Sequence, residues 1–69
     1  MNCTVEELTK IKAGKAKSFT CDSPRLARSG QSLASYVKKF RRDIMPSDVD
    51  GYQTSIDGSV LTVIAIPKL

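Results

Sequence analysis

Basic side chains are the residues of this sequence whose types and spacing point most clearly to chemistry. Five of them, Arg28, Lys38, Lys39, Arg41 and Arg42, occur in the stretch RSGQSLASYVKKFRRD, separated by apolar and small residues. Guanidinium and ammonium groups pair with phosphate oxygens, and Gln and Ser side chains donate hydrogen bonds to nucleic-acid backbone or base edges. No Asp or Glu occurs from residue 23 to residue 42, although a merely solubilising surface usually mixes both signs of charge. The stretch therefore indicates a surface for an acidic partner.

A second basic group surrounds Gly14 and consists of Lys10, Lys12, Lys15 and Lys17. A lysine-rich turn beside a strand can contact phosphate or remain solvated, so its meaning depends on whether it shares a face with the first group. The whole chain carries eleven Lys and Arg against seven Asp and Glu, which gives a net charge of +4. That moderate excess favours nucleic acid or another acidic surface as the partner.

We predict a small basic nucleic-acid-binding protein with an accessory or regulatory role, and DNA is the favoured nucleic acid. The alternative is a protein-binding module or inhibitor that covers an acidic partner surface. Tyr36 fits either base stacking or a place at the border of the core. The predicted binding residues are Arg25, Arg28, Gln31, Ser35, Tyr36, Lys38, Lys39 and Arg42, together with Lys15 and Lys17.

Catalytic groups are sparse in this sequence. There is no histidine, which removes the commonest acid–base group, and there is no phosphate-binding or nucleophile motif. The neighbouring carboxylates Glu6–Glu7 and Asp48–Asp50 fit a helix start and a polar loop. Cys21 precedes a helix start that could lower its pKa, but no base accompanies it. We therefore expect no enzyme activity, no cofactor and no metal site.

The two cysteines, Cys3 and Cys21, are too few for a zinc site in a chain without histidine. They fit a disulfide in an oxidising compartment and small buried hydrophobes in the cytosol, and we favour the second. The first residues lack the basic start and apolar stretch of a signal peptide. The longest apolar run, residues 63–66, is far shorter than a membrane span. We expect a cytoplasmic location and no membrane contact.

The elements that position the basic residues are marked by capping and turn signals. Thr4 and Glu7 fit a capping box for a short helix over about residues 5–12. Residues 16–21 alternate loosely and predict a strand. Asp22 or Ser23 can cap a second helix, with Pro24 in its first turn.

The second helix is predicted from an apolar stripe, and Pro46 is expected to end it. With about 100° of rotation per residue, Tyr36 lies at the border of this stripe, and Arg25 and Arg41 lie on opposite flanks. The residues at least about 120° from Leu33 are Arg28, Gln31, Ser35, Lys38, Lys39 and Arg42. Gly30 either breaks this helix or marks a close contact with the sheet. The stripe residues, spaced 4, 3, 4, 3 and 4 apart, are Leu26, Gly30, Leu33, Val37, Phe40 and Ile44.

The C-terminal third predicts a β-hairpin with a two-residue turn at Asp57-Gly58. That turn pairs Ile56 with Ser59, Thr54 with Leu61 and Tyr52 with Val63. Residues 60–66 carry apolar side chains on both faces of the strand. This pattern predicts a central strand that is covered on both sides.

The expected fold is α+β, with residues 1–69 forming a single domain of order α-β-α-β-β. A three-stranded antiparallel sheet has the final strand in the middle, and its C-terminal hairpin packs against the long amphipathic helix. The short helix or a second subunit of a homodimer would cover Ile64 and Ile66. In size and layout the chain resembles small α+β accessory proteins of phages and mobile elements, without a motif that names a family.

Overall fold

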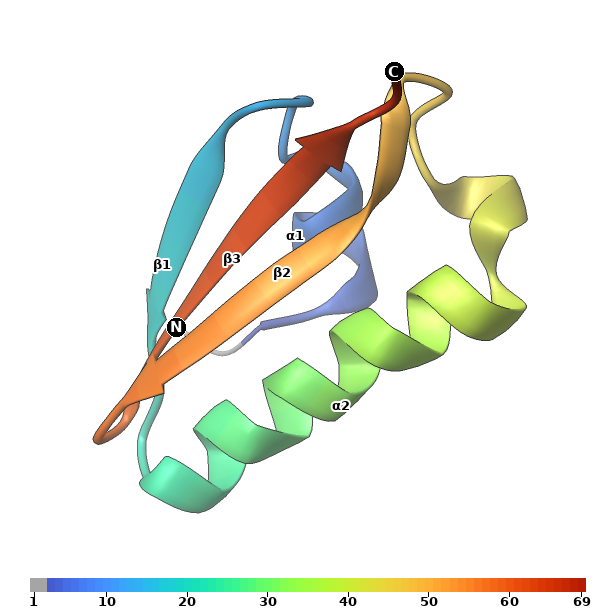
Figure 1. Ribbon diagram of the computed structural model, residues 1–69. Helices are drawn as coiled ribbons and strands as arrows, with labels where there is room; N and C mark the ends of the chain where they lie inside the picture. The colour runs from blue at the N-terminus through green and yellow to red at the C-terminus, as the bar shows by residue number, and fades with distance from the viewer. Residues whose placement is uncertain (1–2) are drawn as a thin grey trace.

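The chain folds in the predicted order, with a short helix, a strand, a long helix and a C-terminal hairpin (Figure 1). The computed structural model describes residues 3–69. The three strands form one antiparallel sheet of order β1-β3-β2, so the final strand is central as predicted. The elements are α1 (Val5–Thr9), β1 (Ala16–Thr20), α2 (Pro24–Phe40), the short 3₁₀ helix η1 (Arg42–Ile44), β2 (Val49–Asp57) and β3 (Val60–Pro67).

Both helices begin at the predicted type of cap. The Thr4 hydroxyl accepts a hydrogen bond from the Glu7 amide at 3.2 Å, and Ser23, rather than Asp22, caps α2 by accepting from the Leu26 amide at 3.3 Å. Glu7 does not complete a capping box, because its carboxylate binds Lys17 instead. The first helix ends at Thr9 and not near residue 12, and the first strand ends one residue early.

The hairpin turn lies one residue later than predicted. Asp57 pairs with Val60, which leaves Gly58 and Ser59 as the loop, and Gly58 has a φ of 63°. A positive φ at the first loop residue alone is typical of a type II′ turn. Every cross-strand pair therefore shifts by two positions, for example Tyr52 to Ala65. Because side chains alternate with a period of two, this shift leaves each residue on its predicted face.

Helix α2 is rotated about its axis relative to the prediction. Its buried residues are Ala27, Gly30, Ala34 and Val37, whereas Phe40 is 71% exposed. At 100° per residue, this stripe lies about 60° from the predicted one. The expectation that Phe40 packs inward is thus wrong. Leu26 and Leu33 are half-buried at the border of the core.

Close contact at Gly30 explains the rotation. A Cβ at Gly30 would lie 2.6 Å from Leu61 Cδ2 and 2.9 Å from Cys3 Cβ. A residue with a Cβ does not fit at these distances, so only glycine allows the helix backbone to come this close to the sheet. The helix therefore approaches the sheet along its smallest residues. The helix does not break there, because it runs without interruption from Pro24 to Phe40. Of the two predicted meanings of Gly30, the close contact is confirmed.

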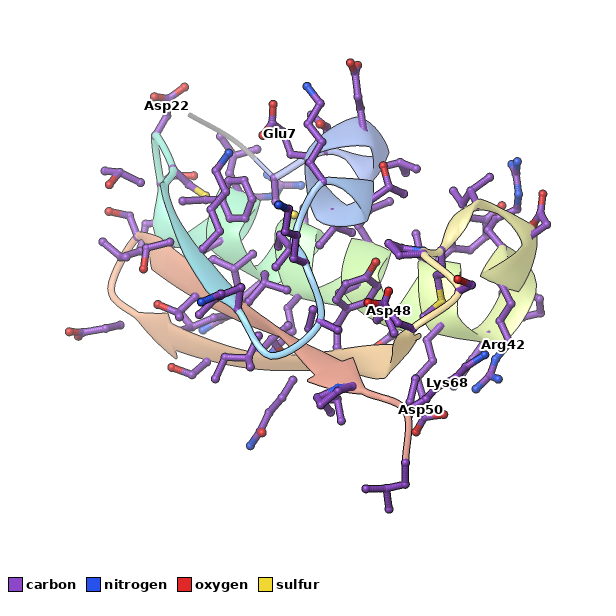
Figure 2. The ribbon with its side chains drawn as sticks, turned by 90° about the horizontal axis from the view of Figure 1, so that it is seen from above. Glu7, Asp22, Arg42, Asp48, Asp50 and Lys68 are labelled. Carbon is purple, nitrogen blue, oxygen red and sulfur yellow. The ribbon has the colours of Figure 1, made fainter. Side chains whose placement is uncertain are left out.

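Both helices cover the same face of the sheet (Figures 1 and 2). This inner face carries Phe19, Leu61 and Val63, which are fully buried, and the Tyr52 hydroxyl, which donates to the Leu8 carbonyl of α1 at 3.3 Å. The short helix therefore does not cover the opposite face. Ile64 and Ile66 point from that face and remain 39% and 37% exposed.

The long helix ends at Phe40, six residues before Pro46. Arg41 leaves the helical conformation with a φ of −129° and a ψ of 45°, and one 3₁₀ turn follows. Pro46 thus does not end α2 as predicted. The turn after α2 redirects the chain, so Arg41 and Arg42 do not continue the helical wheel of the residues before them.

Candidate nucleic-acid interface

The outer side of α2 carries cations that point away from the sheet. Arg25, Arg28 and Lys39 are exposed, and Ser35 lies among them. The helix has seventeen residues and is therefore about 25 Å long. Arg42 adds a fourth exposed cation directly after the helix. We call these four cations, Arg25, Arg28, Lys39 and Arg42, the basic face.

The basic face has no acidic partner among residues 3–69. The ion pairs of this described part are Lys10 with Glu6 and Glu7, Lys17 with Glu7, and Arg41 with Asp43. In Figure 2, Glu7 and Asp22 lie away from Arg42, whereas Asp48 and Asp50 lie at the same end of the molecule as Arg42 and Lys68. Neither Asp48 nor Asp50 takes part in these ion pairs. The positive charge of this face is therefore left for a ligand.

Gln31 and Lys38 lie on the flank of α2 that faces β2 rather than on its outer side. The Gln31 amide donates to the Thr54 hydroxyl at 3.0 Å. The Lys38 side chain passes over Gly51, where a Cβ would lie 3.0 Å from Lys38 Cε. Both residues were predicted on the far side of the helix. The rotation of α2 gives Gln31 a structural bond and places the Lys38 stem against the sheet.

Two aromatic rings are exposed on the other flank of α2. Tyr36 and Phe40 are 46% and 71% exposed, and their ring centroids lie 5.6 Å apart with planes inclined by 40°. Tyr36 was predicted as a binding residue, whereas Phe40 was assigned to the core. The stripe of small residues Ala27, Gly30 and Ala34 is the sequence signal for the side of α2 that packs on the sheet. That signal would have predicted an exposed Phe40.

The two arginines after α2 have different environments. Arg41 Nε donates to Asp43 Oδ1 at 3.4 Å, and this bond, with a smaller effect of Tyr36, raises the pKa of the Arg41 guanidinium. Arg42 Nε donates to the Lys38 carbonyl at 3.0 Å, so the guanidinium binds one of the last carbonyls of α2. Arg41 is thus paired with an acid, whereas Arg42 is held in place by a backbone carbonyl.

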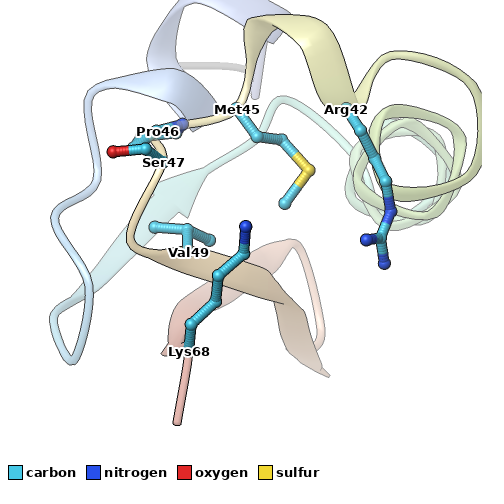
Figure 3. A pocket seen from close by; sticks show the side chains of 6 residues that line it. All are labelled: Arg42, Met45, Pro46, Ser47, Val49 and Lys68. Atoms are coloured by element: carbon cyan, nitrogen blue, oxygen red, sulfur yellow. The ribbon is translucent and has the colours of Figure 1, made fainter.

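A small pocket lies beside Arg42 at the end of the sheet (Figure 3). Its volume is about 110 Å³, and Arg42 and Lys68 supply its only charged side chains. In Figure 3, the Lys68 amine and the Arg42 guanidinium both lie at this pocket. Lys68 was not predicted as a binding residue. The pocket is lined by Arg42, Met45, Pro46, Ser47, Val49 and Lys68.

Lys15 and Lys17 are separate from the basic face. Lys17 lies on β1, at the opposite edge of the sheet from β2, and binds Glu7 Oε2 at 2.6 Å. This bond lowers the pKa of the Glu7 carboxyl. Lys15 is exposed in the turn before β1, where its carbonyl accepts from the Ala65 amide. The structure thus does not bring the two predicted basic groups together.

Both thiols are free and lie at the core. Burial, and to a smaller extent Cys21 and Glu7, raises the pKa of Cys3 to about 11, so this thiol is protonated at neutral pH. A protonated thiol is a poor nucleophile. Among residues 3–69, no three His, Cys, Asp or Glu side chains are grouped as a metal site.

Comparisons of the chain with protein-family models, curated proteins and solved structures found no match. Within residues 3–69, no helix has the length and apolar character needed to cross a membrane. The surface chemistry of this chain is therefore the guide to its function.

Proposed function

We propose that this protein binds nucleic acid through the basic face of α2 and the turn that follows it. The observation that carries the proposal is that Arg25, Arg28, Lys39 and Arg42 are exposed and take part in none of the ion pairs among residues 3–69. Phosphate contacts from such side chains supply most of the affinity for nucleic acid and position the protein on the strand. A regulatory or accessory role by occlusion of the bound strand fits a chain of this size, and DNA is the first candidate.

The pocket at Arg42 and Lys68 suits one phosphate group of the bound strand. Two cations from different parts of the chain converge there, and the Lys68 amide is held by the Asp48 carbonyl at 3.0 Å. Ser35 lies between the cations of the helix and can donate a hydrogen bond to a phosphate oxygen. Gln31 contributes less, because its amide already binds Thr54.

A pair of charge-reversed double variants tests the proposal. Arg28→Glu with Lys39→Glu lowers the net charge from +4 to 0, and so does Lys12→Glu with Lys15→Glu in the turn before β1. All four residues are exposed, so both variants should fold. Binding of fluorescent DNA and RNA is measured by anisotropy at several salt concentrations.

We expect the first variant to lose binding and the second to keep most of it. If two phosphate contacts are lost, the slope of log affinity against log salt should fall by about 1.4 to 1.8. Equal losses in both variants would show that only net charge matters, and unchanged binding in the first variant would refute the proposed surface.

A protein-binding module or inhibitor is the second candidate, and the exposed Phe40 ring favours it. Exposed aromatic and arginine side chains commonly form the centre of protein interfaces. An acidic protein partner would bind with a weaker dependence on salt than DNA or RNA. Pull-down with the wild-type chain before and after nuclease treatment separates the two candidates, because a protein partner survives the nuclease.

A further inference from the structure

The exposed rings of Tyr36 and Phe40 are not explained by the core of the molecule. Aromatic side chains normally bury most of their surface on folding, yet Phe40 keeps 71% of its surface exposed. The contact between the two rings, with centroids 5.6 Å apart, leaves much of both rings free for a ligand. The pair thus offers an aromatic surface on a rigid helix.

The charges next to the rings select the kind of ligand. Lys39 lies between them in the sequence and is exposed, and the exposed Arg41 follows Phe40 directly. No acid occurs from residue 23 to residue 42, and Asp43 is held by Arg41. A ligand that covers the rings therefore meets cations, so its apolar part should be accompanied by negative charge.

We propose that Tyr36 and Phe40 form a stacking site for an unpaired nucleobase of single-stranded DNA or RNA, an inference that rests on the proposed function. A nucleobase presents a flat π surface and brings a phosphate with it, which suits a pair of rings whose sequence neighbour Lys39 is an exposed cation. In a duplex, the faces of the bases are covered by their neighbours. The site therefore requires that a single strand binds more tightly than a duplex of the same sequence.

Substitutions at Phe40 distinguish base stacking from apolar contact. Phe40→Leu keeps an apolar side chain without a π surface, and Phe40→Tyr keeps the ring. The ring is mostly exposed, so both variants should fold. We expect Phe40→Leu to weaken binding of an oligothymidylate roughly five- to hundredfold, and Phe40→Tyr to bind like the wild type. Duplex binding through the basic face should change little in either variant.

An optical readout comes from the tyrosines, since the chain has two and no tryptophan. In the Tyr52→Phe variant, Tyr36 is the only tyrosine, and its fluorescence should be quenched by the single strand and not by the duplex. Retained single-strand affinity in Phe40→Leu, or quenching by both ligands alike, would overturn the stacking site alone. Wild-type protein that binds no nucleic acid would instead refute the proposed function on which the site rests.

Discussion

Replacement of Gly30 by alanine probes the helix orientation on which the whole surface depends. In an unhindered helix, glycine to alanine stabilises by about 1 kcal/mol. Here the new Cβ would lie 2.6 Å from Leu61 Cδ2 and 2.9 Å from Cys3 Cβ. Leu61 has no exposed surface, so it has no free space into which to move.

The steric cost should exceed the gain in helix propensity. Overpacking of a core costs about 1–3 kcal/mol, and two short contacts place Gly30→Ala in the upper part of that range. We expect the free energy of unfolding to fall by about 1–2 kcal/mol, which lowers the Tm by roughly 4–16 °C in a domain of this size. Urea titration followed by circular dichroism measures the change.

Two further variants make the result specific to the contact. Ser32→Ala, at an exposed position of the same helix, has no such neighbour and should be neutral or slightly stabilising. In the background of Leu61→Val, which shortens the contacting side chain, Gly30→Ala should cost less. A stabilising Gly30→Ala would refute the close approach of α2 and with it the outward placement of Phe40.

The other predictions concern single local interactions. Ser23→Ala should lower the free energy of unfolding by about 1 kcal/mol, because the Leu26 amide loses its cap; an unchanged urea midpoint would contradict this role. The bond to Lys17 lowers the pKa of Glu7 from 4.5, so its stabilisation is present above that pH and is lost on acidification; Glu7→Gln should flatten the acid side of the Tm–pH curve, and identical curves would exclude it. Burial raises the pKa of Cys3 from 9.0 to about 11, so alkylation of this thiol at pH 8 should be about a hundredfold slower than in the unfolded chain. Peptide-resolved mass spectrometry measures the two rates, and equal rates would contradict the burial of this thiol.

The order of the elements and the strand order were predictable because they depend on local signals. Thr4 and Ser23 act as caps, and Pro24 occupies the first turn of α2. The run of residues 60–66, apolar on both faces, correctly indicated the central strand. These signals act over a few residues, and they need no knowledge of how the elements pack.

The hairpin register shows how a small local error can leave the faces correct. Asp57-Gly58 and Gly58-Ser59 both suit a two-residue turn, and the first requires a positive φ at Asp57 as well as at Gly58. The structure places Gly58 first in the loop. All pairs moved by two positions, so the division between the buried and open faces was unaffected.

The rotation of α2 could not be read from hydrophobic periodicity alone. The prediction centred the helix on its largest apolar residues, Leu33 and Phe40, whereas the sheet is approached most closely at Gly30. Small residues contribute little to a hydrophobic pattern, but they decide how near two backbones can come. For the same reason, the sequence did not predict that Phe40 lies on the surface. Lys68 was not predicted as a binding residue because only the tertiary fold brings it to the same pocket as Arg42.

The most direct test of nucleic-acid binding by the basic face is an NMR titration of the labelled protein with a single-stranded oligonucleotide. We predict that shifts follow α2 and the turn after it, from Arg25 to Arg42, and weaken as salt is added. The lysines of residues 12–17 and Ile64, on the face of the sheet that the helices leave uncovered, should stay unchanged. Shifts confined to those regions, or a spectrum that does not respond to any nucleic acid, would contradict the account.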